Sequence, residues 1–166
     1  NQVAGYLLLV AASMVAGFIS WGVITDRLRR FGIKPLPVAI IGMSIFIFIQ
    51  CLITFGLVEA VLPLWMLFGF FATAGILPYA ALSQKFPLHL SGRVNTGLNL
   101  LVFISAFAAQ WGTGVIIGMW PKTAAGSYDP AGYQAAFGAI LGIQVLGLLW
   151  LVVFGKGRRA FAHPEI

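Results

Sequence analysis

Five long runs of apolar residues alternate with short polar connections along the chain. The runs cover about residues 3–24, 37–58, 60–83, 94–119 and 133–154. As a helix, each run is long enough to cross the hydrocarbon core of a bilayer, which takes about 20 residues. No run alternates apolar and polar residues as the wall of a membrane barrel does. Since unpaired backbone groups are costly in lipid, the pattern predicts an all-α transmembrane bundle of about five spans.

The composition indicates that lipid surrounds these helices. Hydrophobic residues make up 60% of the chain and charged residues 8%, whereas a soluble domain carries about 25% charged residues. A soluble fold of this size leaves too much surface in water to hide so much apolar material. The formal net charge of +6 does not indicate nucleic acid, because the basic residues lie in short clusters between apolar runs. The expected partner is the lipid bilayer.

Lysines and arginines are distributed very unevenly between the two sets of connections. The segments after the first, third and fifth runs carry four, two and three of them, nine in all, and the remaining one, Lys122, follows the fourth run. Because basic residues stay in the cytoplasm, the N-terminus is expected outside and the tail 155–166 inside. The expected location is the plasma (inner) membrane.

The connection after the first run contains an unusual acid. Asp26 is the only acid in the connections expected on the cytoplasmic side before Glu165, and it lies directly at the end of the first run. Acids contribute little to topology, so the positive-inside rule does not explain it. Gly22 lies one turn earlier, where the backbone of a neighbouring helix could approach closely. The alternative is a basic loop that only sets topology.

This segment resembles the cytoplasmic-loop signature of the major facilitator superfamily, Gly-x-x-x-Asp-Arg-x-Gly-Arg-Arg. The matching residues are Gly22, Asp26, Arg27 and Arg30, and Arg29 stands where the family usually has glycine. The resemblance implies that the chain corresponds to helices eight to twelve of a twelve-helix transporter. Its implied partners are an N-terminal half that this chain lacks, a small-molecule solute and a coupling ion.

A second segment is similar to the loop and start of the eleventh helix in many members of this family. Gly92 and Arg93 precede Asn95 and a helix rich in small residues. In the family, the loop aspartate is thought to face a helix N-terminus of the opposite half when the cytoplasmic side is closed, which a helix dipole favours. The resemblance thus implies that Asp26 belongs to a gate. It also implies that Gly92, Arg93 and Asn95 form a helix start that receives the corresponding loop of the other half.

Four polar residues fall on one side of the fourth run. At helical spacing, Asn95, Asn99, Gln110 and Thr113 lie within about 60° of one another, and Ser105 points elsewhere. Hydrogen bonding between helices is one explanation. A solute cavity is the other, and it requires that Asn99, Gln110 and Thr113 face water or protein rather than lipid. Gln110 lies deepest, so it is the strongest candidate for solute contact.

Pro78 lies within the third run and predicts an interruption of that helix, either a static kink or a hinge. No ionisable residue lies in the middle of a run, where such groups mark ion paths. The sequence has no metal-site or nucleophile motif, so we expect neither an enzyme nor a bound cofactor. The predicted function is transport of a small solute by alternating access. A membrane subunit that only anchors or senses remains the alternative.

Overall fold

The computed structural model describes residues 2–124 and 126–155. The described chain is helical and contains no strand. Its elements are α1 Gln2–Arg30, α2 Pro35–Thr54, α3 Val61–Ala72, the short 3-10 helix η1 Thr73–Ile76, α4 Leu77–Ser83, α5 Leu88–Gly118 and α6 Pro130–Gly155. Five helices in this part of the chain are long and apolar enough to cross a membrane, if α3, η1 and α4 are counted as one span, Val61–Ser83. The prediction of an all-α chain with about five helices able to span a membrane is confirmed.

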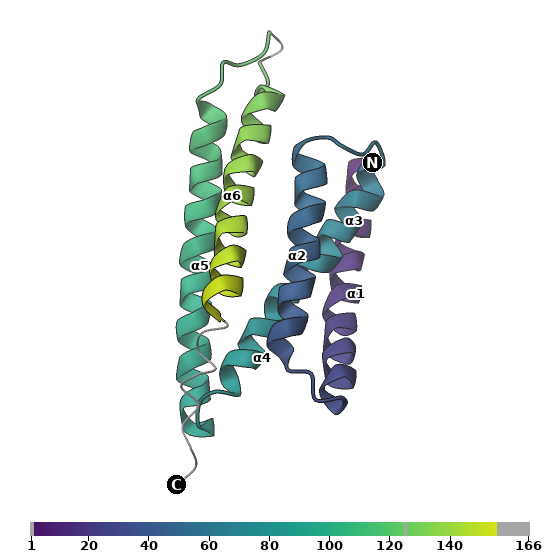
Figure 1. The fold of residues 1–166 in the computed structure, drawn as a ribbon. Coiled ribbons are helices and arrows are strands. Elements are labelled where there is room, and N and C mark those ends of the chain that lie inside the picture. Colours follow the sequence, from purple (N-terminus) through teal and green to yellow (C-terminus); the bar gives the residue numbers. More distant parts are fainter. Residues whose placement is uncertain (1, 125, 156–166) are drawn as a thin grey trace.

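The helices form two groups joined by α2 and α4. Helices α1, α2 and α3 lie together, and α5 pairs with α6 in an antiparallel hairpin (Figure 1). Helix α4 runs obliquely from the first group to the start of α5. Helix α2 contacts α3, α4 and α6, so it connects the two groups along most of its length.

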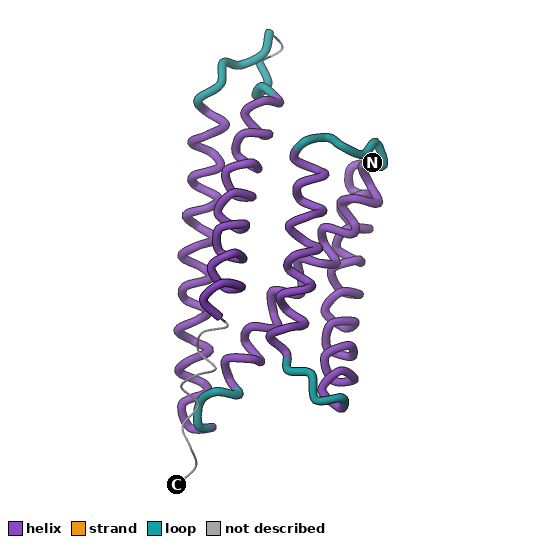
Figure 2. The backbone as a smooth tube through the Cα atoms, in the orientation of Figure 1, coloured by secondary structure: helices purple, strands orange, loops and turns teal. Residues whose placement is uncertain are grey.

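Successive connections lie at opposite ends of the bundle (Figure 2). The α1–α2 and α4–α5 connections share one end, and the α2–α3 and α5–α6 connections lie at the other. The described basic residues follow this division: Arg27, Arg29, Arg30, Lys34, Lys85 and Arg93 lie at the first end and Lys122 at the second. The spatial arrangement therefore matches the division on which the predicted orientation depends.

Several helices extend beyond the apolar runs that predicted them. Helix α1 continues to Arg30, so the residues of the Gly22–Arg30 segment lie on a helix rather than in a loop. Helix α5 begins at Leu88, one to two turns before the predicted start at residue 94. Polar and basic residues can extend a helix past the hydrocarbon core because its last turns lie at the headgroup level, where water is present. Of the predicted tail 155–166, Gly155 ends α6 and residues 156–166 lie outside the described residues.

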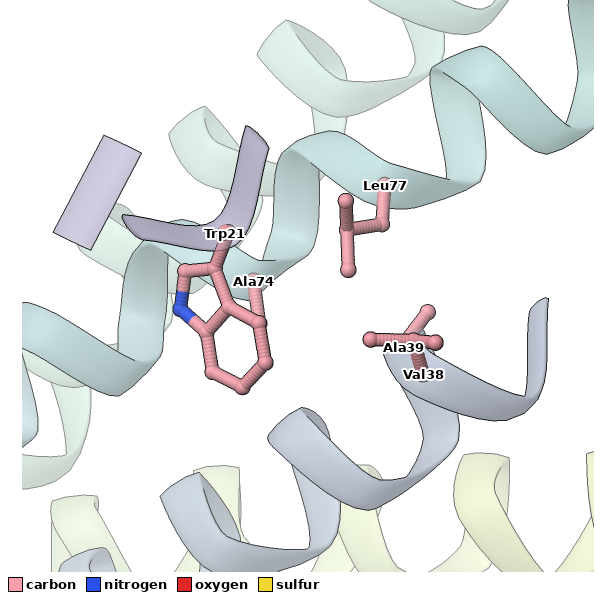
Figure 3. Packing of buried hydrophobic residues seen from close by; sticks show 5 residues of the cluster. All are labelled: Trp21, Val38, Ala39, Ala74 and Leu77. Carbon is pink, nitrogen blue, oxygen red and sulfur yellow. The ribbon is translucent and has the colours of Figure 1, made fainter. Parts of the chain in front are cut away.

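The main core lies where α1, α2 and the interrupted third span meet. The buried side chains are Trp21, Val38, Ala39, Ala74 and Leu77, and the Trp21 ring lies beside Ala74 (Figure 3). Small residues permit this close packing. A Cβ on Gly42 would lie 2.7 Å from the Ala74 Cβ, and one on Gly17 would lie 2.6 Å from the Phe70 carbonyl oxygen. A second cluster of Phe46, Ile47 and Leu141 joins α2 to α6.

The third span is interrupted near Pro78, as the sequence predicts. The α-helical hydrogen bonding of α3 ends at Ala72, and η1 covers Thr73–Ile76 before α4 begins at Leu77. Pro78 lies in the first turn of α4, where its missing N–H leaves no intrahelical bond unmade. The missing donor and the bulk of the ring oppose an α-helical bond to the carbonyl four residues earlier, so regular α-helix is not continuous from α3 into α4.

Candidate functional site

The predicted gating residues lie on the last turns of α1. Asp26, Arg29 and Arg30 line one shallow, open depression at the end of the bundle that carries most of the basic residues. Arg27 is also exposed. Gly22, Asp26, Arg27 and Arg30 match the signature and share this helix end with Arg29, which does not match it. A carboxylate and three guanidinium groups at an exposed helix end fit a topology determinant as well as a gate.

Gly22 does not make the close helix contact that its position suggests. A Cβ added at Gly22 would meet nothing within 4 Å in the described chain. The close approaches are made by Gly17 and Gly42, and by Gly69, where a Cβ would lie 3.0 Å from the Ser13 hydroxyl oxygen. Gly22 is exposed, and no helix of the described residues packs closely against it.

The predicted helix-start site is displaced in the structure. Because α5 begins at Leu88 with Pro87 as its N-cap, Gly92 and Arg93 lie inside the helix, and Asn95 lies further along. The backbone N–H groups of Leu90 and Ser91 already bond to the Pro87 carbonyl. The prediction of a helix N-terminus at Gly92, Arg93 and Asn95 is therefore wrong. The first turns of α5 were predicted to be loop because they contain polar residues and Gly92.

The polar side of α5 divides into two parts. In the first part, the Asn95 side-chain N–H donates to the Ser83 hydroxyl oxygen over 2.9 Å, and that hydroxyl lies 3.1 Å from the Asn95 side-chain oxygen, to which it can donate. One turn away, the Tyr79 hydroxyl donates to the side-chain oxygen of Asn99 over 3.1 Å. These bonds join α4 to α5, so Asn95 and Asn99 act here as contacts between helices.

The second part of the polar side is Gln110 and Thr113. Thr113 is half-buried. Gln110 is exposed, as is every residue of α5 from Asn99 to Trp111. The side chains in the middle of α5 are therefore largely uncovered in the described chain, although α6 runs beside this helix and Asn99 contacts Tyr79 of α4. Gln110 lies on this exposed stretch, about three turns along α5 from Asn99.

Sequence reasoning did not single out Thr25, Gln50 or Gln144, whose polar side chains are wholly or partly buried in the structure. Gln50 in α2 is only 2% exposed. The Thr25 hydroxyl in α1 and the side-chain oxygen of Gln144 in α6 are buried without a hydrogen-bond partner among the described residues. A lone amide inside an apolar run was a usable signal for both glutamines, because polar groups in lipid need partners. Thr25 gave no signal, since threonine can bond to its own helix.

The described residues contain no group of three or more His, Cys, Asp or Glu side chains that could hold a metal ion. Comparison with known proteins assigns no family: no family model matches the chain, and no match is found among curated proteins or solved structures. Function must therefore be inferred from the residues and their geometry.

Proposed function

We propose that this chain is the C-terminal part of a secondary transporter resembling the major facilitator superfamily, and that it moves a small solute by alternating access. One observation carries the proposal. Gln110 is exposed on a helix that is long and apolar enough to span a membrane. An amide that faces hydrocarbon lacks hydrogen-bond partners at a cost of about 1–3 kcal/mol or more. In the intact protein, this side of α5 therefore faces water or a polar protein surface.

The chemistry of Gln110 suits a solute path. An amide both donates and accepts hydrogen bonds, so it can bind a polar or zwitterionic solute without itself being ionised. Thr113 lies one turn further along the same helix and half-buried, where its hydroxyl adds a second polar group. Solute sites of this kind are mostly apolar with a few polar groups that fix orientation, and the surrounding residues of α5 are mainly Leu, Phe, Ala and Gly.

Further support comes from the end of the bundle with most of the basic residues. The residues Gly22, Asp26, Arg27 and Arg30 share the last turns of α1, and the resemblance to the family signature implies that they belong to a gate. The proposed partners are the other half of the transporter, the solute and a coupling ion. In this proposal, the N-terminus is outside and the C-terminal tail is in the cytoplasm of a plasma (inner) membrane.

A non-transporting anchor or sensor is the second candidate, and the hydrogen bonds of Asn95 and Asn99 favour it. They show that polar residues on α5 serve packing. If Gln110 does the same with another protein surface, the face of α5 around it is an interface and no solute path exists. Catalysis has no support from the residues, so we do not propose an enzyme.

Cysteine accessibility separates these candidates. The intact protein with Cys51→Ala supplies a background without thiols in this chain, into which Gln110→Cys or Ala108→Cys is introduced. Ala108 is a matched control because it is exposed at nearly the same depth but points to the opposite side of α5 at helical spacing. In sealed vesicles, a membrane-impermeant thiol reagent should label Gln110→Cys and leave Ala108→Cys unlabelled.

Uptake into the same vesicles tests the function itself. Saturable uptake of one solute from a panel of sugars, amino acids and organic ions, with that solute slowing the labelling of Gln110→Cys, is the expected result. Labelling at Gln110→Cys without any uptake would favour the sensor. If neither Gln110→Cys nor Ala108→Cys is labelled, whichever side of the membrane the reagent is added to, there is no aqueous path along this side of α5.

A further inference from the structure

One exposed side of α5 changes from basic to apolar along the helix. At 100° per residue, His89, Arg93, Leu100 and Phe107 fall within about 40° of one another, and we call this row the outer stripe of α5. All its residues are exposed, Leu100 by 61% and Phe107 by 72%. The outer stripe is a different side of the helix from Gln110, which lies about 80° round from Leu100.

The neighbouring helices contact α5 away from the outer stripe. The Tyr79 hydroxyl of α4 bonds to Asn99, which lies about 100° round from Leu100. On α6, a Cβ at Gly132 would lie 3.2 Å from the Ile117 carbonyl oxygen of α5, and Ile117 lies about 100° round from Leu100 in the same direction as Asn99. The contacts of α4 and α6 therefore leave the outer stripe exposed.

The basic part of the outer stripe has a lysine close by in the sequence and no acid. Lys85 lies in the connection just before α5 and is exposed, as are His89 and Arg93. No Asp or Glu occurs in the sequence between Glu59 and Asp129, and these two acids belong to the connections at the opposite end of the bundle (Figure 2). This corner therefore attracts anions, and lysine and arginine are the usual side chains for binding phosphate.

The apolar part of the outer stripe suits lipid better than it suits another helix. Helices that pack closely in a membrane meet through small residues. The α1–α3 contact is of that kind, because Gly17 and Gly69 leave no room for a Cβ. Leu100 and Phe107 are large and have no polar group, so they are well placed against acyl chains.

The distances along α5 match the length of one lipid. With a rise of about 1.5 Å per residue, Leu100 lies about 10 Å beyond Arg93 and Phe107 about 21 Å beyond it. One leaflet contributes about 15 Å to the hydrocarbon core of a bilayer. A headgroup at Arg93 would therefore place the acyl chains of the same lipid along Leu100 and toward Phe107.

We propose that the outer stripe binds an anionic phospholipid from the leaflet at the basic end of the bundle. Its phosphate lies at Lys85, His89 and Arg93, and its acyl chains lie along Leu100 and Phe107. Basic clusters at the membrane surface favour lipids with a net negative charge over zwitterionic lipids. The inference goes beyond solute transport and does not depend on it, since an anchor or a sensor could bind the same lipid.

Quenching by labelled lipids tests the site without a transport assay. The intact Cys51→Ala protein with a bimane fluorophore on Leu100→Cys is placed in phosphatidylcholine vesicles. The vesicles contain a minor fraction of phosphatidylglycerol or phosphatidylcholine that carries a nitroxide on its acyl chain. We expect about two- to fivefold stronger quenching by the phosphatidylglycerol. Leu101→Cys is the matched control, because Leu101 is equally exposed at the same depth but about 100° round the helix, and it should show no such preference.

Lys85→Gln combined with Arg93→Gln should abolish the preference at Leu100→Cys, whereas Lys122→Gln at the opposite end should leave it unchanged. Equal quenching by the two lipids at Leu100→Cys would overturn the site, as would a preference that survives the double variant. The same preference at Leu101→Cys would overturn it too, because anionic lipid would then gather around the whole protein. Absence of quenching by either lipid would show that protein covers the outer stripe and would also overturn the proposal. These results would leave the proposed transport function untouched.

Discussion

The hydroxyl of Tyr79 donates a 3.1 Å hydrogen bond to the side-chain oxygen of Asn99, and this bond joins α4 to α5. Asn99 is on the polar side of α5 that also contains Gln110, so one row of polar residues serves two purposes. Near the end of the bundle with most of the basic residues, it holds two helices together. Further along α5, its member Gln110 is exposed in the described chain.

Breaking the Tyr79–Asn99 bond should destabilise the bundle modestly. Tyr79→Phe removes only the hydroxyl, and we expect the free energy of unfolding to fall by about 0.5–1.5 kcal/mol, as for other hydrogen bonds between membrane helices. The measurement is denaturation in mixed detergent micelles, with Asn99→Leu and the double variant completing a cycle. Additive losses from the two single changes would mean that the bond contributes nothing.

Close packing of α1 on α3 should depend on glycine. Gly17→Ala places a Cβ about as close to the Phe70 carbonyl oxygen as a hydrogen bond, at 2.6 Å. The helices must then separate, so we expect a loss of about 1–3 kcal/mol in unfolding free energy, typical of overpacking. Gly5→Ala on the same helix meets nothing within 4 Å and should be neutral or slightly stabilising, because alanine favours helix. A stable Gly17→Ala protein would contradict the observed α1–α3 contact.

Apolar run length was enough to predict five spans, because lipid imposes helix on any long apolar segment. The interruption of the third span was predicted from Pro78. Run length could not predict where helices end in water, so α1 and α5 continue through residues that were assigned to loops. The start of α5 at Leu88 places Gly92 and Arg93 inside the helix and not at its N-terminus. The partners of Asn95 and Asn99 were also beyond prediction, since helical periodicity gives the face of a residue and not the helix opposite it.

The orientation of the chain is a prediction that impermeant reagents can check. With Cys51→Ala, single cysteines at Arg29 and Lys122 report the two ends of the bundle. Because the basic residues gather at the Arg29 end, we expect labelling at Lys122→Cys and none at Arg29→Cys in intact cells. Permeabilised cells, in which both positions should react, are the control. The reverse pattern in intact cells would place the basic end outside.

The role of Asp26 distinguishes a gate from a topology determinant. Asp26→Asn keeps the shape of the side chain and removes its charge. The attraction between a carboxylate and a helix N-terminus stabilises the closed arrangement by about 0.3–1 kcal/mol. We therefore expect about two- to fivefold slower transport by the intact protein with unchanged expression and solute affinity. Glu59→Gln, an exposed acid in the α2–α3 connection at the other end, should have no effect. Equal turnover in Asp26→Asn and the parent would reduce the segment to a topology determinant.

The candidate solute contact is tested by comparing Gln110 with Ser105. Both residues are exposed in the uncovered middle of α5, but they point to different sides of the helix at helical spacing. If the Gln110 amide binds solute, Gln110→Ala removes one hydrogen bond from the complex. The apparent affinity should then fall about three- to tenfold, the equivalent of a hydrogen bond of about 0.5–1.5 kcal/mol. Ser105→Ala should leave it unchanged.

The required measurement is the concentration dependence of uptake by the two variants at matched expression, together with their thermal unfolding in detergent. A structural role for Gln110 would lower thermal stability and the amount of folded protein without changing apparent affinity. That result would mean that the amide bonds to a neighbouring helix of the intact protein, as Asn99 bonds to Tyr79. The uncovered side of α5 would then be a helix interface, and the solute path would have to follow another face of the bundle.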